Sequence, residues 1–197
     1  MQRLNTAHAH GGFPLTQLTF EYNFGVRPDR YVMINFWGFS QLINSLGGIY
    51  INAGRSHSDH RDQYGTYSVP GGSVYMDGAT ALWYVRSRYT SSDFDRTRRQ
   101  QEVILGLFYR LLTLDALQKA PELYNIYRQN VTLDLALEDL QPFLPLAAQI
   151  GETDNIKNYY IGSDNVTNFR TPGGAAVLLP QCEEVVEIMR QALSSPE

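Results

Sequence analysis

The sequence lacks the features by which several protein classes are recognised. Its 197 residues include one cysteine, Cys182, so no internal disulfide can form. No apolar run reaches the length of a membrane helix, and the first five residues do not resemble a signal peptide. CxxC pairs, HExxH and the phosphate-cradling GxxxxGKS or GxxxxGKT are also missing. These absences leave a globular chain without a recognisable metal or P-loop motif.

The composition favours one folded domain over residues 1–197. Hydrophobic residues make up 43% of the chain and charged residues 18%, which is typical of a globular protein and not of disorder. The 13 tyrosines suit a groove lined for sugar stacking, or a tyrosine-rich core. The segment His57-Ser-Asp-His60 suggests either a metal site or, as we favour, a mobile polar loop.

Arginine is concentrated in one short stretch of this acidic chain. The net charge is −4, yet five of the 16 basic residues lie between positions 86 and 99, and all five are arginine. They are Arg86, Arg88, Arg96, Arg98 and Arg99. Such a group of guanidinium ions is expected to meet an anion.

The spacing around these arginines predicts their local structure. Arg86 and Arg88 end an apolar run two residues apart, so they share a face if the segment is extended. Ser92 and Asp95 have the spacing of a capping box, followed by apolar residues at helical intervals. We therefore expect a helix from about residue 93 to about residue 113.

Three arginines in the first two turns of a helix are unfavourable, because the N-terminal end already carries a positive dipole. A phosphate there would reverse the balance, since backbone amides and arginine forks would bind it together. Several forks suit a diphosphate better than a single phosphate. The alternative is a solvated face on which Asp93 and Asp95 pair locally with the arginines.

Cap and glycine signals divide the rest of the chain. The first half suggests helices at 15–24, 36–46 and 78–85, a buried strand at 31–35, a strand at 49–51, and a polar loop or hairpin at 53–68. The second half suggests helices at 115–128 and 137–150, strands at 156–161 and 175–179, a loop at 165–174 and a helix after Pro180. We expect an α/β fold, a three-layer α-β-α sandwich with a mixed central sheet flanked by helices.

Several ordered motifs resemble one family. The pattern Leu82-x-Tyr84-x-Arg86-x-Arg88, followed by Asp93-Phe94-x-Arg96-x-x-Arg99-Gln100-Gln101, is similar to the signature of the LytR-CpsA-Psr family. Three upstream segments also match: Asp29 to Phe39, Leu46-Gly-Gly48, and Pro70 to Leu82. The resemblance covers residues 4–112 closely and 113–197 more loosely, and the set in this order is much more specific than any one motif.

The resemblance implies an envelope phosphotransferase acting in cell wall biogenesis. Such enzymes take a glycopolymer such as teichoic acid from a polyprenyl-pyrophosphate carrier, transfer it to peptidoglycan and release polyprenyl phosphate. By matching position, Arg86, Arg88, Arg96 and Arg99 would bind the pyrophosphate, and Gln100 would orient it. Arg98 matches no fixed position of the family, so we expect it on the outside. Asp93, paired in catalysis with Arg96, would hold the arginines or act as base for the acceptor hydroxyl.

A pocket for the lipid tail is the next expectation, although packing in the core is the more frequent role of such residues. Its candidate lining is Phe39, Leu42, Ile43, Leu46, Leu107, Phe108 and Leu111. The resemblance also implies Mg²⁺ as cofactor and a place on the extracytoplasmic face of the cell membrane. No anchor is visible in this chain.

One departure from the family bears on catalysis. The family domain begins with two strands that carry its metal-binding aspartates, and nothing in this sequence matches them. We therefore expect turnover only if those strands are supplied. The alternatives are a non-catalytic module that binds polyprenyl pyrophosphate or glycan, or a pyrophosphatase. A nucleic-acid-binding regulator ranks last, because the basic residues are confined to one patch.

Overall fold

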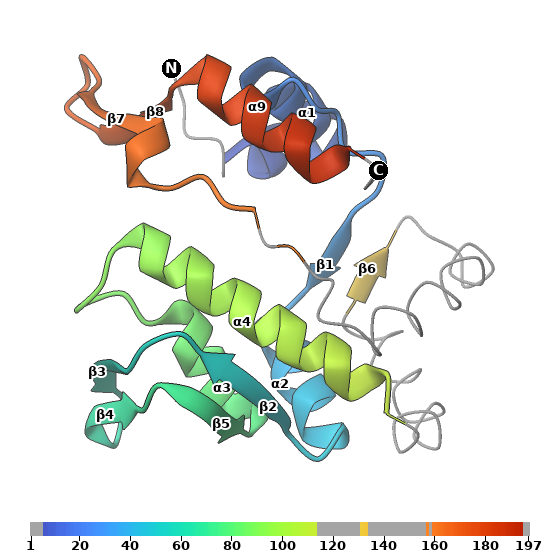
Figure 1. Ribbon diagram of the computed structural model, residues 1–197, viewed down its shortest axis with the longest axis vertical. Helices are drawn as coiled ribbons and strands as arrows, with labels where there is room; N and C mark the ends of the chain where they lie inside the picture. The colour runs from blue at the N-terminus through green and yellow to red at the C-terminus, as the bar shows by residue number, and fades with distance from the viewer. Residues whose placement is uncertain (1–5, 114–130, 134–156, 158, 195–197) are drawn as a thin grey trace. The chain divides into compact units, whose positions relative to one another are not determined.

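A computed structural model describes residues 6–113, 131–133, 157 and 159–194. The chain divides into two compact units, residues 32–154 and residues 1–31 with 155–197 (Figure 1). The α/β class is confirmed, and the assignment of residues 1–197 to one domain stays a prediction. Among the described residues no helix is both long and apolar enough to cross a membrane.

The unit of residues 32–154 carries the predicted site. Its elements are β1 (Val32–Ile34), α2 (Phe36–Ser45), β2 (Ile49–Ala53), β3 (His57–Arg61), β4 (Gly65–Val69), β5 (Gly72–Met76), α3 (Gly78–Arg86), α4 (Asp93–Leu111) and β6 (Val131–Leu133). Strand β2 pairs with β5, β3 with β4 and β1 with β6, each in antiparallel register.

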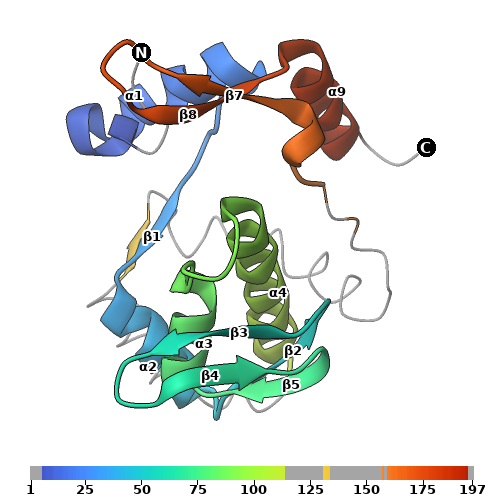
Figure 2. The same ribbon diagram turned by 90° about the vertical axis from the view of Figure 1, so that its left-hand side faces the viewer.

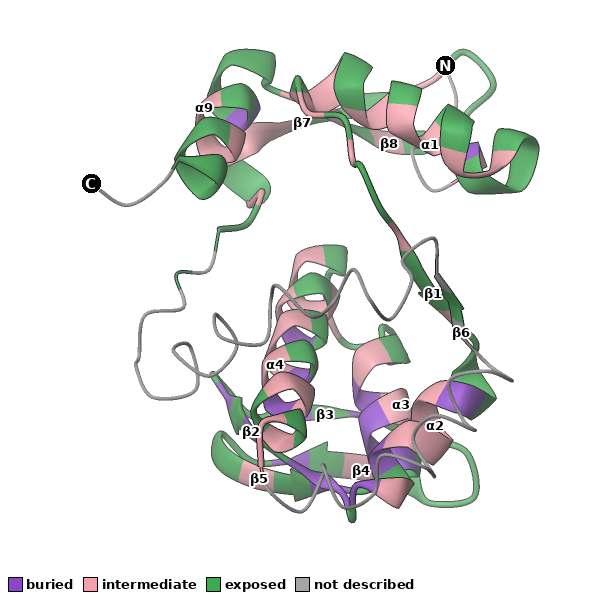
Figure 3. Cartoon of the chain, turned by 90° about the vertical axis from the view of Figure 1, so that its right-hand side faces the viewer, coloured by how far each residue is buried: buried purple, intermediate pink, exposed green. Residues whose placement is uncertain are grey.

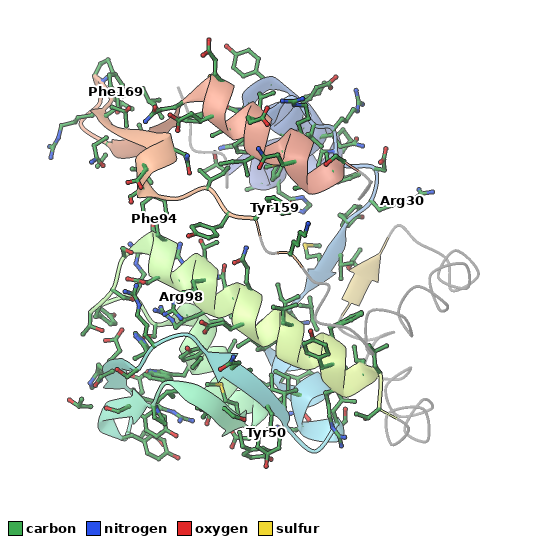
Figure 4. The ribbon with its side chains drawn as sticks, viewed as in Figure 1. Arg30, Tyr50, Phe94, Arg98, Tyr159 and Phe169 are labelled. Carbon is green, nitrogen blue, oxygen red and sulfur yellow. The ribbon has the colours of Figure 1, made fainter. Side chains whose placement is uncertain are left out.

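Helices α3 and α4 lie over the same face of β2, β3, β4 and β5 (Figure 2). The strand pairings described in this unit are all antiparallel, and a short turn joins the two strands in the pair of β3 with β4. On β2, burial alternates strictly, with Ile49, Ile51 and Ala53 buried and Tyr50 exposed on the other side (Figure 4). Alternation of this kind places one face of the strand in the core.

The hydrophobic core lies between α2, α3, α4 and the strands (Figure 3). Its completely buried members come from three elements: Ile43 of α2, Ile49 of β2, and Ala81 and Tyr84 of α3. Val103 contributes from α4 with 1% exposure. This core fixes α3 and α4 against each other, and with them the segment that joins the two helices.

Most predicted helix boundaries are confirmed. The Asn35 side chain accepts from the Gly38 amide at 2.7 Å and so begins α2, and the left-handed Gly47 and Gly48 end it. The strand expected at residues 31–35 is present as β1, but its burial was predicted wrongly. Val32 is 68% exposed and Met33 44%.

The second unit consists of α1 (Ala7–Phe24), η3 (Ser163–Asn165), β7 (Val166–Arg170), β8 (Ala176–Pro180) and α9 (Cys182–Leu193). Gly25 ends α1 in the left-handed conformation, as predicted. The strand at 175–179 is confirmed as β8, whereas β7 occupies half of the expected loop at 165–174. No strand forms at the described residues 157 and 159–161. The helices expected at 115–128 and 137–150 lie outside the described residues.

Candidate functional site

The arginine loop, residues 86–92, joins α3 to α4. Arg86 is the last residue of α3, so Arg86 and Arg88 do not lie on one extended segment: the helix that Asp77 caps continues through the apolar run. The Arg86 guanidinium lies 4.2 Å from the centre of the Phe36 ring, a cation–π contact at the start of α2. Arg88 is exposed, and no hydrogen bond or ion pair joins it to the described residues.

The first turn of α4 has the predicted capping box. Ser92 Oγ accepts from the Asp95 amide at 3.2 Å, and the Asp95 carboxylate faces back to the Ser92 amide. Arg96 pairs with Asp93 at 3.2 Å, and Arg55 pairs with Asp95. The local pairing weighed as an alternative therefore occurs at Asp93, whereas Asp95 pairs with an arginine outside the group of residues 86–99. These carboxylates offset the positive end of α4, so anion binding must depend on the arginines more than on its amides.

Arg99 differs from the other arginines of the group because its side chain is completely buried. Its Nε donates to the carbonyl oxygen of Tyr84 at 2.8 Å, and one terminal nitrogen donates to the carbonyl oxygen of Ser87. The other terminal nitrogen donates to Ser91 Oγ at 3.1 Å. Arg99 therefore binds the last turn of α3 at one point and the arginine loop at two, and its guanidinium is directed at protein acceptors.

Gln100 and Arg98 are next to Arg99 but make different contacts. The Gln100 side chain is exposed and reaches the carbonyl oxygen of Val85 at 3.4 Å. Arg98 does not face outwards as expected: its side chain is 30% exposed and pairs with Glu102 (Figure 4). Glu102 also accepts from the Tyr84 hydroxyl at 2.8 Å. Burial and this bond to Glu102 raise the pKa of Tyr84 to about 12.

A buried polar line, made of Asp59, Ser87, His57 and Arg99, runs beneath the arginine loop. Ser87 Oγ lies 2.7 Å from Asp59 Oδ2 and 2.5 Å from His57 Nε2, and His57 Nδ1 lies 3.5 Å from a terminal nitrogen of Arg99. All four side chains are less than 9% exposed. The prediction of a mobile loop at His57 is wrong, since residues 57–61 form β3.

Sequence reasoning missed this line because its residues carry no hydrophobic signal. His57 and Asp59 alternate with exposed residues along β3, which is the strand period. The period is visible only if histidine and aspartate are counted as inward-facing residues. Their partners, Ser87 and Arg99, lie 28 to 42 residues away in sequence, and only the fold brings them together.

These contacts shift the pKa of the Asp59 carboxylate and the pKa of the His57 imidazole. Burial alone raises the pKa of Asp59, but hydrogen bonds from Ser87 Oγ and from the amides of His60 and Tyr89 outweigh it, and the pKa is lowered. Burial and the nearby Arg99 cation lower the pKa of His57. The line therefore joins a guanidinium to a carboxylate through a neutral imidazole and a hydroxyl.

Comparison with known proteins identifies the family. The family model described as the LytR_cpsA_psr family matches residues 1–190. The chain belongs to this family.

Named relatives agree with this assignment. The polyisoprenyl-teichoic acid–peptidoglycan teichoic acid transferase TagU of Enterococcus faecalis is 33% identical over 141 residues, which are 71% of this chain and 45% of that protein. The chain thus spans about half the length of the curated relatives it matches.

Solved structures agree as well. The crystal structure of Bacillus subtilis TagV has a TM-score of 0.76 at 22% identity, covering 99% of this chain and 76% of that one. A structure of TagT bound to LIIa-WTA has a TM-score of 0.73 at 25% identity, covering 98% and 72%.

The residues expected to line a lipid pocket are mostly part of the LytR_cpsA_psr core. Ile43 and Leu46 are completely buried, and Phe39 and Leu107 pack against the core cluster. Leu42 and Phe108 are partly buried, while Leu111 is 38% exposed. Packing accounts for the first four, and the pocket stays a prediction.

The Mg²⁺ ion that the family resemblance implies would need carboxylate oxygens of the protein as ligands. No group of three or more His, Cys, Asp or Glu residues in this part of the chain is placed to hold a metal ion. His57 and Asp59 bind their protein neighbours instead, and His60 lies 3.6 Å from Asp62 on the exposed side of β3. The described residues alone therefore do not make a Mg²⁺ site.

Proposed function

We propose that this chain is part of a transferase that moves a teichoic-acid-like glycopolymer from a polyprenyl-pyrophosphate carrier to peptidoglycan. Family membership and the names of the relatives support the reaction class. The observation that carries the proposal for these residues is the exposed Arg88, which has no partner among the described residues although it lies on a tightly held loop. Two more arginines, Arg86 and Arg96, flank it.

The arginines would bind the two phosphates of the carrier. A guanidinium stays charged at any relevant pH and binds phosphate through two parallel hydrogen bonds. Arg86 and Arg88 are exposed, and the Arg96 side chain beside Asp93 is 29% exposed. All three are therefore accessible to a ligand. Arg99 supports the proposal differently from the expectation, by holding the loop that carries them.

Asp93 is the proposed base. Its side chain is 59% exposed, and within the described part of the chain it forms an ion pair with Arg96. In the transfer, an acceptor hydroxyl oxygen would attack the phosphorus attached to the glycan, and its proton would pass to Asp93. The bridging P–O bond would break, and polyprenyl phosphate would leave with the electron pair. The arginines would neutralise the charge on both products.

Cofactor and location complete the proposal. We include Mg²⁺ as the cofactor because the family resemblance implies it. The relatives are cell-envelope proteins by name, and we place this chain at the extracytoplasmic face of the membrane, where peptidoglycan is the acceptor.

The binding part of the proposal is tested by calorimetric titration with a geranyl-diphospho-sugar. Arg88→Ala is expected to weaken binding on the order of tenfold or more, the loss of one charge-assisted contact. Arg190→Ala is the matched control, because Arg190 is a 75% exposed arginine on α9 that pairs with Glu187. Equal affinities for the wild type and Arg88→Ala would overturn the assignment of this residue.

Transfer itself is tested by following a labelled glycan from the lipid carrier to peptidoglycan with Mg²⁺ present. Label in peptidoglycan that disappears in Asp93→Asn supports the transferase. Tight binding without transfer or release would support the non-catalytic binding module instead, and release to water would support a pyrophosphatase.

A further inference from the structure

The buried polar line holds the arginine loop from below at two places. Asp59 Oδ2 accepts from Ser87 Oγ at 2.7 Å and from the amide of Tyr89 at 2.9 Å. Arg88 lies between these two residues. A third bond, from Thr90 Oγ1 to the carbonyl oxygen of Ser58, joins the same loop to the same strand. The backbone on both sides of Arg88 is therefore attached to β3.

The protons along the line follow from its chemistry. Asp59 is an ionised acceptor, so the single hydroxyl proton of Ser87 points to it. Ser87 Oγ must then accept from His57, which places the imidazole proton on Nε2. The lone pair of His57 Nδ1 is left to accept from Arg99, over the long distance of 3.5 Å. Each group donates to the next, from the guanidinium to the carboxylate.

This order differs from that of a nucleophilic triad. In a triad the imidazole accepts the serine proton and the carboxylate orients the imidazole. Here the hydroxyl lies between the imidazole and the carboxylate, and the Ser87 residue is only 8% exposed. The geometry suits a bracing role and not attack on a substrate.

A proton on His57 Nδ1 would disrupt the line at Arg99. The new N–H of His57 would point at an N–H of Arg99, and the imidazolium cation would repel the guanidinium cation. The positive charges of Arg99 and Arg98 of α4, and of Arg55 ahead of β3, lower the pKa of His57, and the negative charge of Asp59 raises it. The ring also packs on Trp83 and Tyr84 at 5.5 Å and 5.8 Å, which leaves it little room to turn away.

We propose that His57, Ser87 and Asp59 are positioning residues for the arginine loop, and that protonation of His57 loosens the loop and lowers its affinity for a diphosphate. The proposal rests on the proposed function in one respect only, the identity of the ligand. Its mechanism is that Arg99 bonds to the carbonyl oxygen of Ser87 and to Ser91 Oγ, so repelling Arg99 releases the loop from α4.

The probe is a geranyl-diphospho-sugar, because its doubly esterified pyrophosphate gains no proton between pH 5 and 8. Calorimetry is expected to show wild-type affinity falling several-fold from pH 8 to pH 5.5. His57→Gln keeps an N–H near the position of Nε2 but cannot be protonated. It should bind a few-fold more weakly at pH 8 and show no decline with acid. A decline in His57→Gln equal to that of the wild type would overturn the proposal.

Amide hydrogen exchange gives a readout that does not need the ligand. The Tyr89 amide is expected to be protected at pH 8 and to lose protection, corrected for intrinsic rate, at pH 5.5 in the wild type but not in His57→Gln. In Ser87→Ala protection should be low at both values. If the wild type fails to bind the probe, the proposed function is wrong, and exchange still decides the positioning role. Acid-independent protection of Tyr89 in the wild type would refute it.

Discussion

The Nε of Arg99 donates to the carbonyl oxygen of Tyr84 over 2.8 Å, in the last turn of α3. Carbonyl groups at a helix C-terminus have no partner within the helix, and a cation there also offsets the negative end of the dipole. A buried guanidinium meets both needs at once. This one side chain therefore couples the end of α3 to the second turn of α4.

Arg99→Lys is expected to lower the free energy of unfolding by about 2–4 kcal/mol. Lysine keeps the charge but cannot reach Tyr84, Ser87 and Ser91 together, so it leaves buried acceptors without a donor. Urea unfolding followed by circular dichroism measures the change.

Arg96→Ala is the matched variant on the same helix. Its exposed pair with Asp93 should change the free energy of unfolding by less than about 1 kcal/mol, while diphosphate binding weakens. If Arg99→Lys proved as stable as Arg96→Ala, the structural role given to Arg99 would be wrong.

Stability should fall with acid because of His57. Its pKa is lower in the folded protein than the ordinary value of 6.5, so the unfolded chain takes up the proton more readily. The stabilisation is complete above pH 6.5 and is lost as the pH falls from there towards the folded-state pKa. Urea midpoints at pH 7.5 and pH 5 should therefore differ more for the wild type than for His57→Gln. A parallel shift in both proteins would assign the pH dependence to other groups.

Local signals were predictable from the sequence, and the buried polar contacts were not. In the capping box of Ser92 with Asp95 and in the cap at Asn35, the two partners are three residues apart, so the local sequence is enough to predict both. Arg99 lies three residues after Arg96 and looks the same in a motif, yet one is buried and the other is paired at the surface. That difference depends on where α3 ends, which is a property of the packed fold.

The cap at the start of α3 is also testable. Asp77 Oδ1 accepts from the Thr80 amide at 2.7 Å, so Asp77→Ala is expected to cost about 1 kcal/mol, whereas Asp77→Asn should cost less. Hydrogen bonds from Thr80 lower the pKa of Asp77 below its ordinary value of 3.8. The part of the cap energy that needs the charge is thus present above pH 3.8 and lost below it. Thermal unfolding of the three proteins at pH 7 and pH 3 measures both effects, and an equal loss in Asn and Ala would show that the side chain does not cap.

Close packing of α2 on α3 leaves no room for a side chain at Gly78. A Cβ there would lie 2.1 Å from the carbonyl oxygen of Ser40 and 2.8 Å from its Cα, and backbone atoms cannot move aside cheaply. The Gly78 amide also donates to Asn44 at 2.8 Å, which holds the two helices at this distance. Gly78→Ala is therefore expected to lower the free energy of unfolding by about 1–3 kcal/mol, the usual cost of overpacking.

Gly173→Ala is the control for Gly78→Ala, since no atom lies within 4 Å of an added Cβ at Gly173 and its backbone is not left-handed. Urea unfolding should show little change for the control and a clear loss at Gly78. The arginine loop follows α3 directly, so the shift that Gly78→Ala forces on the helix should also weaken diphosphate binding. Normal stability and normal binding in Gly78→Ala would contradict the close contact between Gly78 and Ser40.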